Sequence, residues 1–370
     1  MYKKIIVLFF LILVLVFCAW SLRPQQIPAP NINTNSVVIA TSTKQVSEEK
    51  PKIATTTKTN KAVITKLVVS QEPKVTIPVV EQKPIEPTPD FEAINTFARE
   101  ATVNILCTTK NSSLSPISGT GIIISPDGLI LTNAHVAQFF LLRDLYQKDF
   151  IQCVIRTGSP AYPRYRAELV YISPTWVEKN KTEIKLENPQ GTGEKDFAFL
   201  RITDAINDSD LPKFSFIPVN VREKIDVGEP VVLVSYPAGF LGGQTIIQNL
   251  NMTSAITYIQ GVFTFSENVI DAIGVGGTVV SQKGASGGAV VDKNSSLIGI
   301  ISTSSSGDTT SSRDLNAITL AYINRTFQSE TGLTLSQFLS QDIASFAKTF
   351  QENTAPALTK LLTDEITKNQ

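Results

Sequence analysis

Hydrophobic and polar residues divide the chain into stretches with different patterns, and the first is an unbroken apolar run, Ile5–Trp20. Extended to Leu22, this run is long enough for a tilted helix that crosses a bilayer. No small-x-small cleavage site follows it, so we expect residues 1–22 to be a membrane anchor, with a cleaved signal peptide as the alternative. Lys3 and Lys4 precede the run, which predicts a cytoplasmic N-terminus and an extracytoplasmic remainder.

Residues 23–89 follow a second pattern, without any glycine or aromatic residue but with nine of the chain's twenty prolines. Such a segment buries too little apolar surface to offset the entropy that ordering costs. We therefore expect a disordered stalk, stiffened by proline, that holds the next domain away from the membrane. Apolar residues then recur at helical spacing from Asp90 to Ala101, which predicts a short helix leading into the folded domain.

From Val103 onward the pattern changes to short, mostly β-branched apolar runs separated by Gly, Pro, Asn and Asp. Many short strands with turn residues between them are typical of an all-β sandwich or barrel. The expected strands are Val103–Cys107, Gly121–Ser125, Leu129–Leu131, Ile151–Ile155, Ala198–Ile202, Pro230–Ser235, Gly288–Val291 and Leu297–Ile301.

Two helical stretches interrupt this pattern. One is Ala134–Leu145, and the other begins at Leu335, where apolar residues again recur every three or four positions. We therefore expect a β domain at residues 90–326 and a helical C-terminal tail at residues 327–370.

Composition narrows the class of function. Lys+Arg and Asp+Glu balance at 33 each in 370 residues, and the absence of a basic arm argues against nucleic acid as a partner. The chain has a single histidine, His135, so a multi-histidine metal site is excluded, and we expect neither a metal nor an organic cofactor. Cys18 falls in the apolar run. Cys107 and Cys153 lie in expected strands outside the membrane, where a disulfide and two buried free thiols both remain open.

Three segments carry candidate chemistry, and two of them supply a base and an acid. In the first, Pro126-Asp127-Gly128 predicts a turn between two apolar strands, the second of which leads to His135. In the second, Asp196 opens an alternating strand that points its side chain away from the surface. Three other acids, at positions 204, 208 and 226, are the alternatives to Asp196.

The third segment is Gly284-Ala-Ser286-Gly-Gly, in which glycines let backbone N–H groups converge beside a hydroxyl. A serine nucleophile needs a base, an acid that orients the base, and fixed donors for the developing oxyanion. The three segments together supply each of these groups.

These segments resemble those of the chymotrypsin-like serine peptidases, especially bacterial trypsin-like domains of the HtrA type. The resemblance rests on Thr132-Asn-Ala-His135-Val, on Asp196-Phe-Ala-Phe-Leu and on Gly284-Ala-Ser286-Gly-Gly, in the order His, Asp, Ser. It covers residues 101–326 and implies an all-β, chymotrypsin-like double β-barrel.

The resemblance also implies a role for each residue. Ser286 would be the nucleophile, His135 the general base and then the acid, and Asp196 the group that fixes the histidine tautomer. Backbone N–H groups of Gly284 and Ser286 would form the oxyanion hole.

For substrate binding, the resemblance points to the strand that begins at Leu297. Its residues Ser302, Thr303 and Ser304 would lie beside the substrate backbone, with Ser302 also supporting the acid. Val280 occupies the position where trypsins hold the acid that selects a basic P1 residue, so we expect a small or medium apolar P1 residue instead.

Departures from the family pattern add further expectations. Ala285 precedes the nucleophile where digestive trypsins have an aspartate, and no Ile-Val-Gly-Gly segment is present, so we do not expect zymogen cleavage. Only 44 residues follow Thr326, which is too few for the PDZ module of HtrA relatives. The long connections at Phe139–Ile155 and Ser173–Gly193 are candidates for covering the substrate cleft.

The sequence therefore predicts a membrane-anchored serine endopeptidase that acts outside the cytoplasm on polypeptides, including unfolded or envelope proteins. HtrA relatives often form trimers, which leaves a homo-oligomer open. A catalytically silent scaffold with the same fold is the alternative from another class, and an esterase is the nearer one because acyl transfer uses the same groups.

Overall fold

The computed structural model describes residues 88–110, 114–186, 191–265, 268–304, 309–310 and 313–368. The predicted membrane anchor and nearly all of the predicted stalk lie outside these residues. Within them, none of the helices combines the length and the apolar character that crossing a membrane requires.

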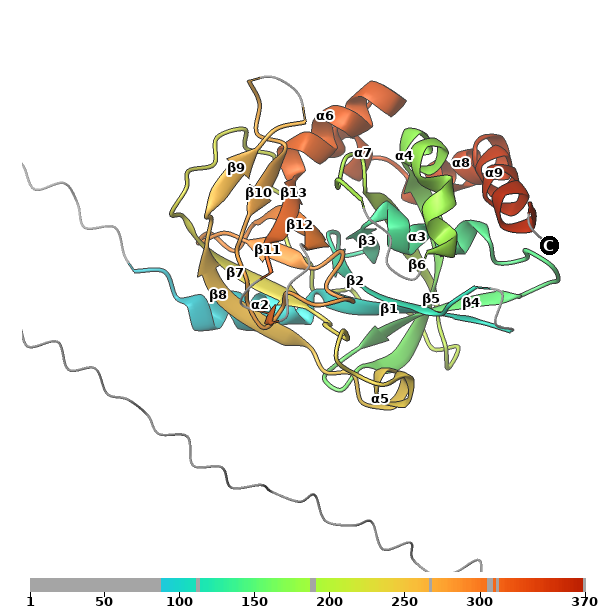
Figure 1. Cartoon of the computed structure of the whole chain (residues 1–370), viewed down its shortest axis with the longest axis horizontal. Coiled ribbons are helices and arrows are strands. Elements are labelled where there is room, and N and C mark those ends of the chain that lie inside the picture. The colour runs from blue at the N-terminus through green and yellow to red at the C-terminus, as the bar shows by residue number, and fades with distance from the viewer. Residues whose placement is uncertain are drawn as a thin grey trace, which may run out of the picture. The chain divides into compact units, whose positions relative to one another are not determined.

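Six strands form a closed antiparallel barrel in the order β1-β2-β3-β6-β5-β4 (Figure 1). All four residues of β3 are buried, whereas β4 alternates between buried and more exposed positions. The sequence predicted five of the six strands, while β5 was missed. The strands are β1 (Thr102–Thr109), β2 (Ile117–Ile123), β3 (Leu129–Thr132), β4 (Ile151–Thr157), β5 (Tyr162–Ile172) and β6 (Ala198–Ala205).

The predicted turn between β2 and β3 is confirmed. Gly128 adopts the left-handed conformation with φ of 81°, and its N–H donates to Ser125 O at 3.1 Å. A glycine tolerates this conformation without the steric cost that a Cβ would bring. The hairpin ends at Thr132, so the chain that follows it reaches His135 within three residues.

The other seven strands form one antiparallel sheet in the order β8-β7-β11-β12-β13-β10-β9. The sequence predicted a second closed barrel, but β8 and β9, at the two ends of this order, do not pair with each other. They are consecutive in the chain, and the change of partner falls at Ile259, whose N–H donates to Glu229 O, and Gln260, whose N–H donates to Gly274 O. The second sheet is therefore open, and the chain passes from one of its edge strands to the other at Ile259 and Gln260. The strands are β7 (Pro230–Ser235), β8 (Thr253–Tyr258), β9 (Gly261–Phe263), β10 (Ala272–Gly274), β11 (Ala289–Val291), β12 (Leu297–Ser304) and β13 (Leu315–Thr319).

Helices surround the two sheets. The predicted entry helix is α2, capped by the Asp90 carboxylate, which accepts from Ala93 N at 3.0 Å. The predicted tail is also helical, but α6 spans position 326, where the sequence placed the domain boundary. The helices are α2 (Phe91–Glu100), α3 (Ala134–Leu141), α4 (Pro174–Asn180), the 3-10 helix η1 (Lys181–Lys185), α5 (Gly243–Gln248), α6 (Leu320–Thr331), α7 (Leu335–Leu339), α8 (Ile343–Asn353) and α9 (Ala355–Thr367).

The tail lies against the first barrel. Helix α8 contacts β5, and α9 contacts α3, α4 and η1. The described part of Ser173–Gly193 folds into α4 and η1, which contact α9. Two apolar side chains of α9, Leu358 and Leu362, are buried there. The role of Ser173–Gly193 in covering the substrate cleft stays a prediction.

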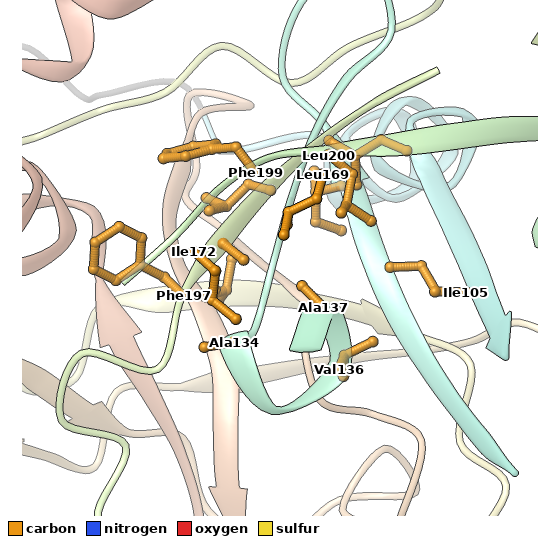
Figure 2. Packing of buried hydrophobic residues seen from close by; sticks show 14 of the residues in the cluster. Ile105, Ala134, Val136, Ala137, Leu169, Ile172, Phe197, Phe199 and Leu200 are labelled. Carbon is orange, nitrogen blue, oxygen red and sulfur yellow. The ribbon is translucent and has the colours of Figure 1, made fainter. Parts of the chain in front are cut away.

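The core brings α3 against β5 and β6. Figure 2 shows Ala134 and Ala137 of α3 close to Ile172 of β5 and Phe197 of the segment that leads into β6. All four are at most 1% exposed. This packing sets the segment that carries His135 beside the segment that carries Asp196.

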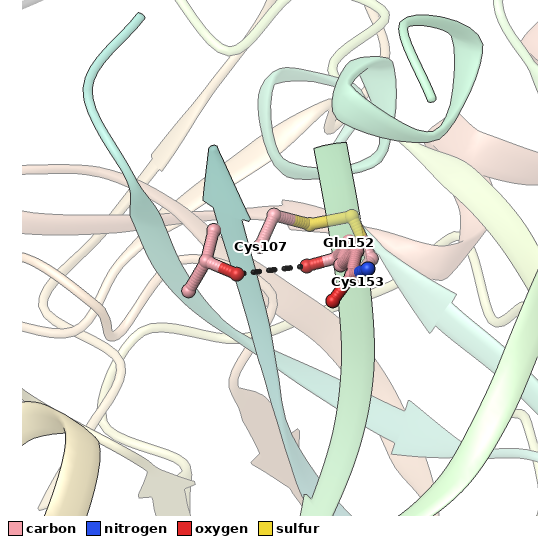
Figure 3. The surroundings of a disulfide bond; sticks show 4 residues. Cys107, Gln152 and Cys153 are labelled. Atoms are coloured by element: carbon pink, nitrogen blue, oxygen red, sulfur yellow. Dashed lines mark hydrogen bonds between the residues drawn. A yellow bond between two sulfur atoms is a disulfide. The ribbon is translucent and has the colours of Figure 1, made fainter. Parts of the chain in front are cut away.

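A disulfide joins Cys107 and Cys153 (Figure 3). The two residues are direct partners in the pairing of β1 with β4, which closes the barrel. The sequence could not distinguish a disulfide from two free thiols, because only the register of β1 with β4 shows that the two cysteines lie opposite each other.

Candidate active site

His135 lies in the first turn of α3, directly beyond the hairpin. Asn133 is the N-cap residue, and its Nδ2 donates to the Asp196 carbonyl at 2.8 Å. The next turn also contributes, because Gln138 Nε2 donates to the His135 carbonyl at 3.0 Å. The imidazole is partly exposed, at 23%, so it remains accessible from solvent.

Asp196 uses both carboxylate oxygens to hold this histidine. Oδ1 accepts from the His135 backbone N–H at 3.0 Å, and Oδ2 accepts from His135 Nδ1 at 2.8 Å. Ser302 Oγ also donates to Oδ2, at 2.9 Å. Because an ionised carboxylate only accepts, the proton of a neutral imidazole lies on Nδ1, and Nε2 is left with its lone pair.

The alternative acids do not reach the histidine. Asp204, Asp208 and Asp226 are all exposed, whereas the Asp196 side chain is only 6% exposed. The structure therefore brings together His135 and the acid that the sequence favoured.

The electrostatics of the pair follow from its burial and charge. Burial is the largest single influence and lowers the pKa of His135, since it disfavours the imidazolium. The negative charge of Asp196 and its hydrogen bond act in the opposite direction, and together they raise the pKa of His135 above its ordinary value of 6.5.

The Ser286 turn is attached to the first barrel through Thr120 of β2. Thr120 N donates to Ser286 O at 2.8 Å, and Thr120 Oγ1 donates to Gly284 O at 2.7 Å. The Thr120 carbonyl in turn accepts from Thr132 Oγ1 at 2.7 Å. Thr132 precedes His135 by three residues. The sequence analysis did not predict this role of Thr120. A threonine between two glycines in an apolar strand could have indicated a place where another segment packs closely.

The Ser286 hydroxyl has no hydrogen bond to any described residue. Hydrogen bonds between a nucleophile and its base are often long in unliganded enzymes and tighten when substrate binds. The structure thus joins the acid to the histidine and sets the serine turn on the neighbouring strands.

Two backbone N–H groups of the serine turn are available to a ligand. The amides of Ala285, Gly287 and Gly288 donate to Gln282 O, Ile301 O and Ala285 O. The amides of Gly284 and Ser286 have no acceptor among the described residues. Gly284 has φ of 90°, and a Cβ there would lie 2.7 Å from the Tyr236 carbonyl, so the turn requires glycine.

The expected substrate-binding residues occupy different environments. Thr303 and Ser304 pair through their backbones with Asn316 and Leu315 of β13. Ser302 lies at the bulge in this pairing and bonds to Asp196, as the resemblance implied. Val280 is fully buried in the core of the second sheet, so its role in substrate selection stays a prediction.

No cluster of three or more His, Cys, Asp or Glu side chains suited to a metal ion occurs in the part of the chain that the structure describes. The site residues that the sequence predicted thus comprise a hydroxyl, an imidazole held by an acid, and two backbone amides without an acceptor among the described residues, which are the groups that acyl transfer uses.

Comparison with known proteins gives a family match for the same region. Residues 119–300 match the model of a trypsin-like peptidase domain. No curated protein sequence matches the chain. Similar solved structures include a serine endoprotease from Yersinia pestis, with 20% identity over 66% of this chain and 67% of that chain and a TM-score of 0.41.

Two further structures resemble the chain. Deg5 is 14% identical over 64% of this chain and 93% of its own, with a TM-score of 0.43. The HtrA-type protease AlgW, solved with a tripeptide, is 19% identical over 65% of this chain and 64% of its own, with a TM-score of 0.41. The chain thus spans about two thirds of the length of the Yersinia protease and of AlgW.

Proposed function

We propose that this chain is a serine endopeptidase, because residues 119–300 match the model of a trypsin-like peptidase domain, and that Ser286, His135 and Asp196 are its catalytic triad. The observation that supports this most directly is the 2.8 Å hydrogen bond from His135 Nδ1 to Asp196 Oδ2. It leaves Nε2 unprotonated and therefore able to act as a base.

In the proposed mechanism, His135 Nε2 takes the proton of the Ser286 hydroxyl as Oγ attacks the peptide carbonyl. The amides of Gly284 and Ser286 stabilise the oxyanion that forms. The C–N bond then breaks, and the amine leaves with the proton from His135. Water hydrolyses the acyl-enzyme with the same histidine as base, which releases the acid product and regenerates the serine.

The test uses the full chain in detergent, treated with a fluorophosphonate probe and then given unfolded casein. We expect the parent to be labelled and to cleave casein, and Ser286→Ala to do neither. Ser296→Ala, on the partly exposed turn between β11 and β12, is the matched control and should behave as the parent. A folded parent that neither reacts nor cleaves would favour the catalytically silent scaffold.

We also propose that the chain is anchored in a membrane by residues 1–22, with the peptidase domain on the extracytoplasmic side. Lys3 and Lys4 before the apolar run support this orientation. The disulfide between Cys107 and Cys153 supports an oxidising compartment, because such bonds are rare in the cytosol.

Membrane fractions test the anchor. The protein should stay with membranes in alkaline carbonate and be released by detergent, whereas a chain lacking residues 1–22 should be soluble. Protease added outside intact cells or spheroplasts should digest the domain. Resistance to that protease, or reduced cysteines in the isolated protein, would argue against the proposed side.

A further inference from the structure

The carboxylate of Glu330, at the end of α6, is held in a mostly buried position behind the site. Its side chain is 11% exposed, and Oε2 accepts a hydrogen bond from the Tyr171 hydroxyl of β5. Oε1 accepts from Ser173 Oγ at 2.9 Å and lies 3.6 Å from Lys195 Nζ. Three side chains from two separate segments of the first barrel therefore converge on one acid of α6.

Lys195 is the residue directly before Asp196, and its backbone is in the left-handed region with φ of 59°. That conformation is unfavourable for a residue with a Cβ and persists only when the surroundings hold it. Helix α6 holds Lys195 at two points, because Tyr322 Oη accepts from its backbone N–H at 2.9 Å and Glu330 pairs with its ammonium group.

An aromatic cluster joins α6 to β5 and to the segment that follows Asp196. Phe197 and Phe199, which follow Asp196, contact Tyr171. Phe327 of α6 packs edge-on against both Tyr171 and Phe199. These rings are nearly all buried, so α6 has a defined position relative to the segment that carries Asp196.

We propose that Glu330 is a positioning residue for the proposed catalytic acid: through Lys195 it fixes the left-handed turn that presents the Asp196 carboxylate to His135. This inference rests on the proposed triad. Glu330 acts through Lys195 and Asp196, and is not itself a group that reacts.

The two phenols beside Glu330 and Lys195 keep one protonation state over the acid limb of the pH profile, which is the range in which activity falls as the pH is lowered. Burial raises the pKa of Tyr322 to about 12, and it also raises the pKa of Tyr171, with the charge of Glu330 adding to the effect. Both phenols are therefore neutral where the activity falls at low pH. A change in the acid limb then reports on His135 and Asp196.

The experiment compares full-length Glu330→Gln with the parent by casein cleavage, pH profile and thermal unfolding. We expect kcat to fall by about 10- to 100-fold at nearly constant KM, since small misplacement of a catalytic group has effects of that size. The acid limb should move to lower pH, because a displaced Asp196 raises the pKa of His135 less.

Matched variants separate positioning from general stability. Glu223→Gln removes another ion pair of α6, with Arg325, that has no contact with Asp196, and it should leave kcat and the acid limb unchanged. Lys195→Met should repeat the effect of Glu330→Gln, and Lys195→Arg should restore most of kcat. If Glu330→Gln does not fold, Lys195→Met and Lys195→Arg still test the positioning role.

An unchanged kcat and acid limb in folded Glu330→Gln and Lys195→Met, with only a lower unfolding temperature, would make the Glu330 cluster merely structural and overturn the inference. A parent that is not labelled at Ser286 would overturn both the triad and the positioning role. The two failures are distinct, because the first appears only in the variants.

Discussion

At the scale of single residues, the site depends on one carboxylate that satisfies three donors. Asp196 accepts from the backbone and the ring of His135 and from Ser302. An amide in its place would present an NH₂ group to at least one of these donors. The hydrogen-bond pattern that keeps the proton on Nδ1 therefore requires an acid.

Replacing this acid is the first prediction. Asp196→Asn should lower kcat by about 10⁴-fold with little change in fold, because the wrong histidine tautomer is then stabilised. Asp204→Asn, at an exposed position on β6, is the control and should retain activity. The measurement is the rate of casein cleavage by each variant at the same concentration of folded protein. If Asp196→Asn remains active, another residue must be the catalytic acid.

The second prediction concerns pH. As the proposed base, His135 takes a proton only when neutral, so activity should be present above its pKa and be lost as the pH falls through it. Since Asp196 raises this pKa, the midpoint of the acid limb of kcat/KM should lie above 6.5. A profile of initial rates measures it, and a midpoint below that value would contradict the pairing.

At the scale of elements, the serine turn depends on a glycine conformation. Gly284→Ala should lower kcat by about 10²- to 10³-fold, because the new Cβ would displace a proposed oxyanion donor. Gly228→Ala is a matched control, since Gly228 also has φ of 90° but a Cβ there would meet no atom within 4 Å. Both substitutions strain the backbone. Only Gly284→Ala should lower kcat when the rate is divided by the concentration of folded protein.

The disulfide between β1 and β4 supports a further prediction at this scale. Its cysteines are 46 residues apart, so removing the cross-link should lower the free energy of unfolding by about 2–4 kcal/mol. Denaturant titration of the Cys107→Ser/Cys153→Ser double variant measures this loss. The bond joins β1 to β4, and neither cysteine is bonded to a residue of the proposed triad, so kcat of the folded variant should be unchanged.

The sequence predicted the helices and strands whose apolar residues recur at a regular spacing. It missed those whose conformation depends on contacts with segments far away in the chain. The first half of β5 alternates between exposed and partly buried positions and contains Pro163, so it carries no apolar period. Helix α6 follows a strand without a break, but Thr319 caps it and Gly332 ends it with φ of 80°. Those two end signals were present in the sequence.

At the scale of the whole molecule, the two sheets meet at Thr120. Thr120→Val removes the hydroxyl that donates to Gly284 O and accepts from Tyr236 N at 3.0 Å. We expect at least a tenfold lower kcat/KM, because a shifted serine turn misaligns the nucleophile. Thr102→Val, another buried threonine with a hydroxyl bond at 2.8 Å, should cost only about 1 kcal/mol of stability.

Casein cleavage and denaturant unfolding of both threonine variants make the comparison. Equal losses of activity in Thr120→Val and Thr102→Val would show that the junction has no special part in aligning the serine. A loss confined to Thr120→Val would support it.

The sequence by itself determined the β class, the hairpin that leads to His135, the serine turn and the entry helix, because each depends on residues close together in the chain. Only the tertiary structure decided the disulfide and the contact of Glu330 with Lys195. These pairings depend on strand register and on how α6 packs against the first barrel, and no local pattern encodes either.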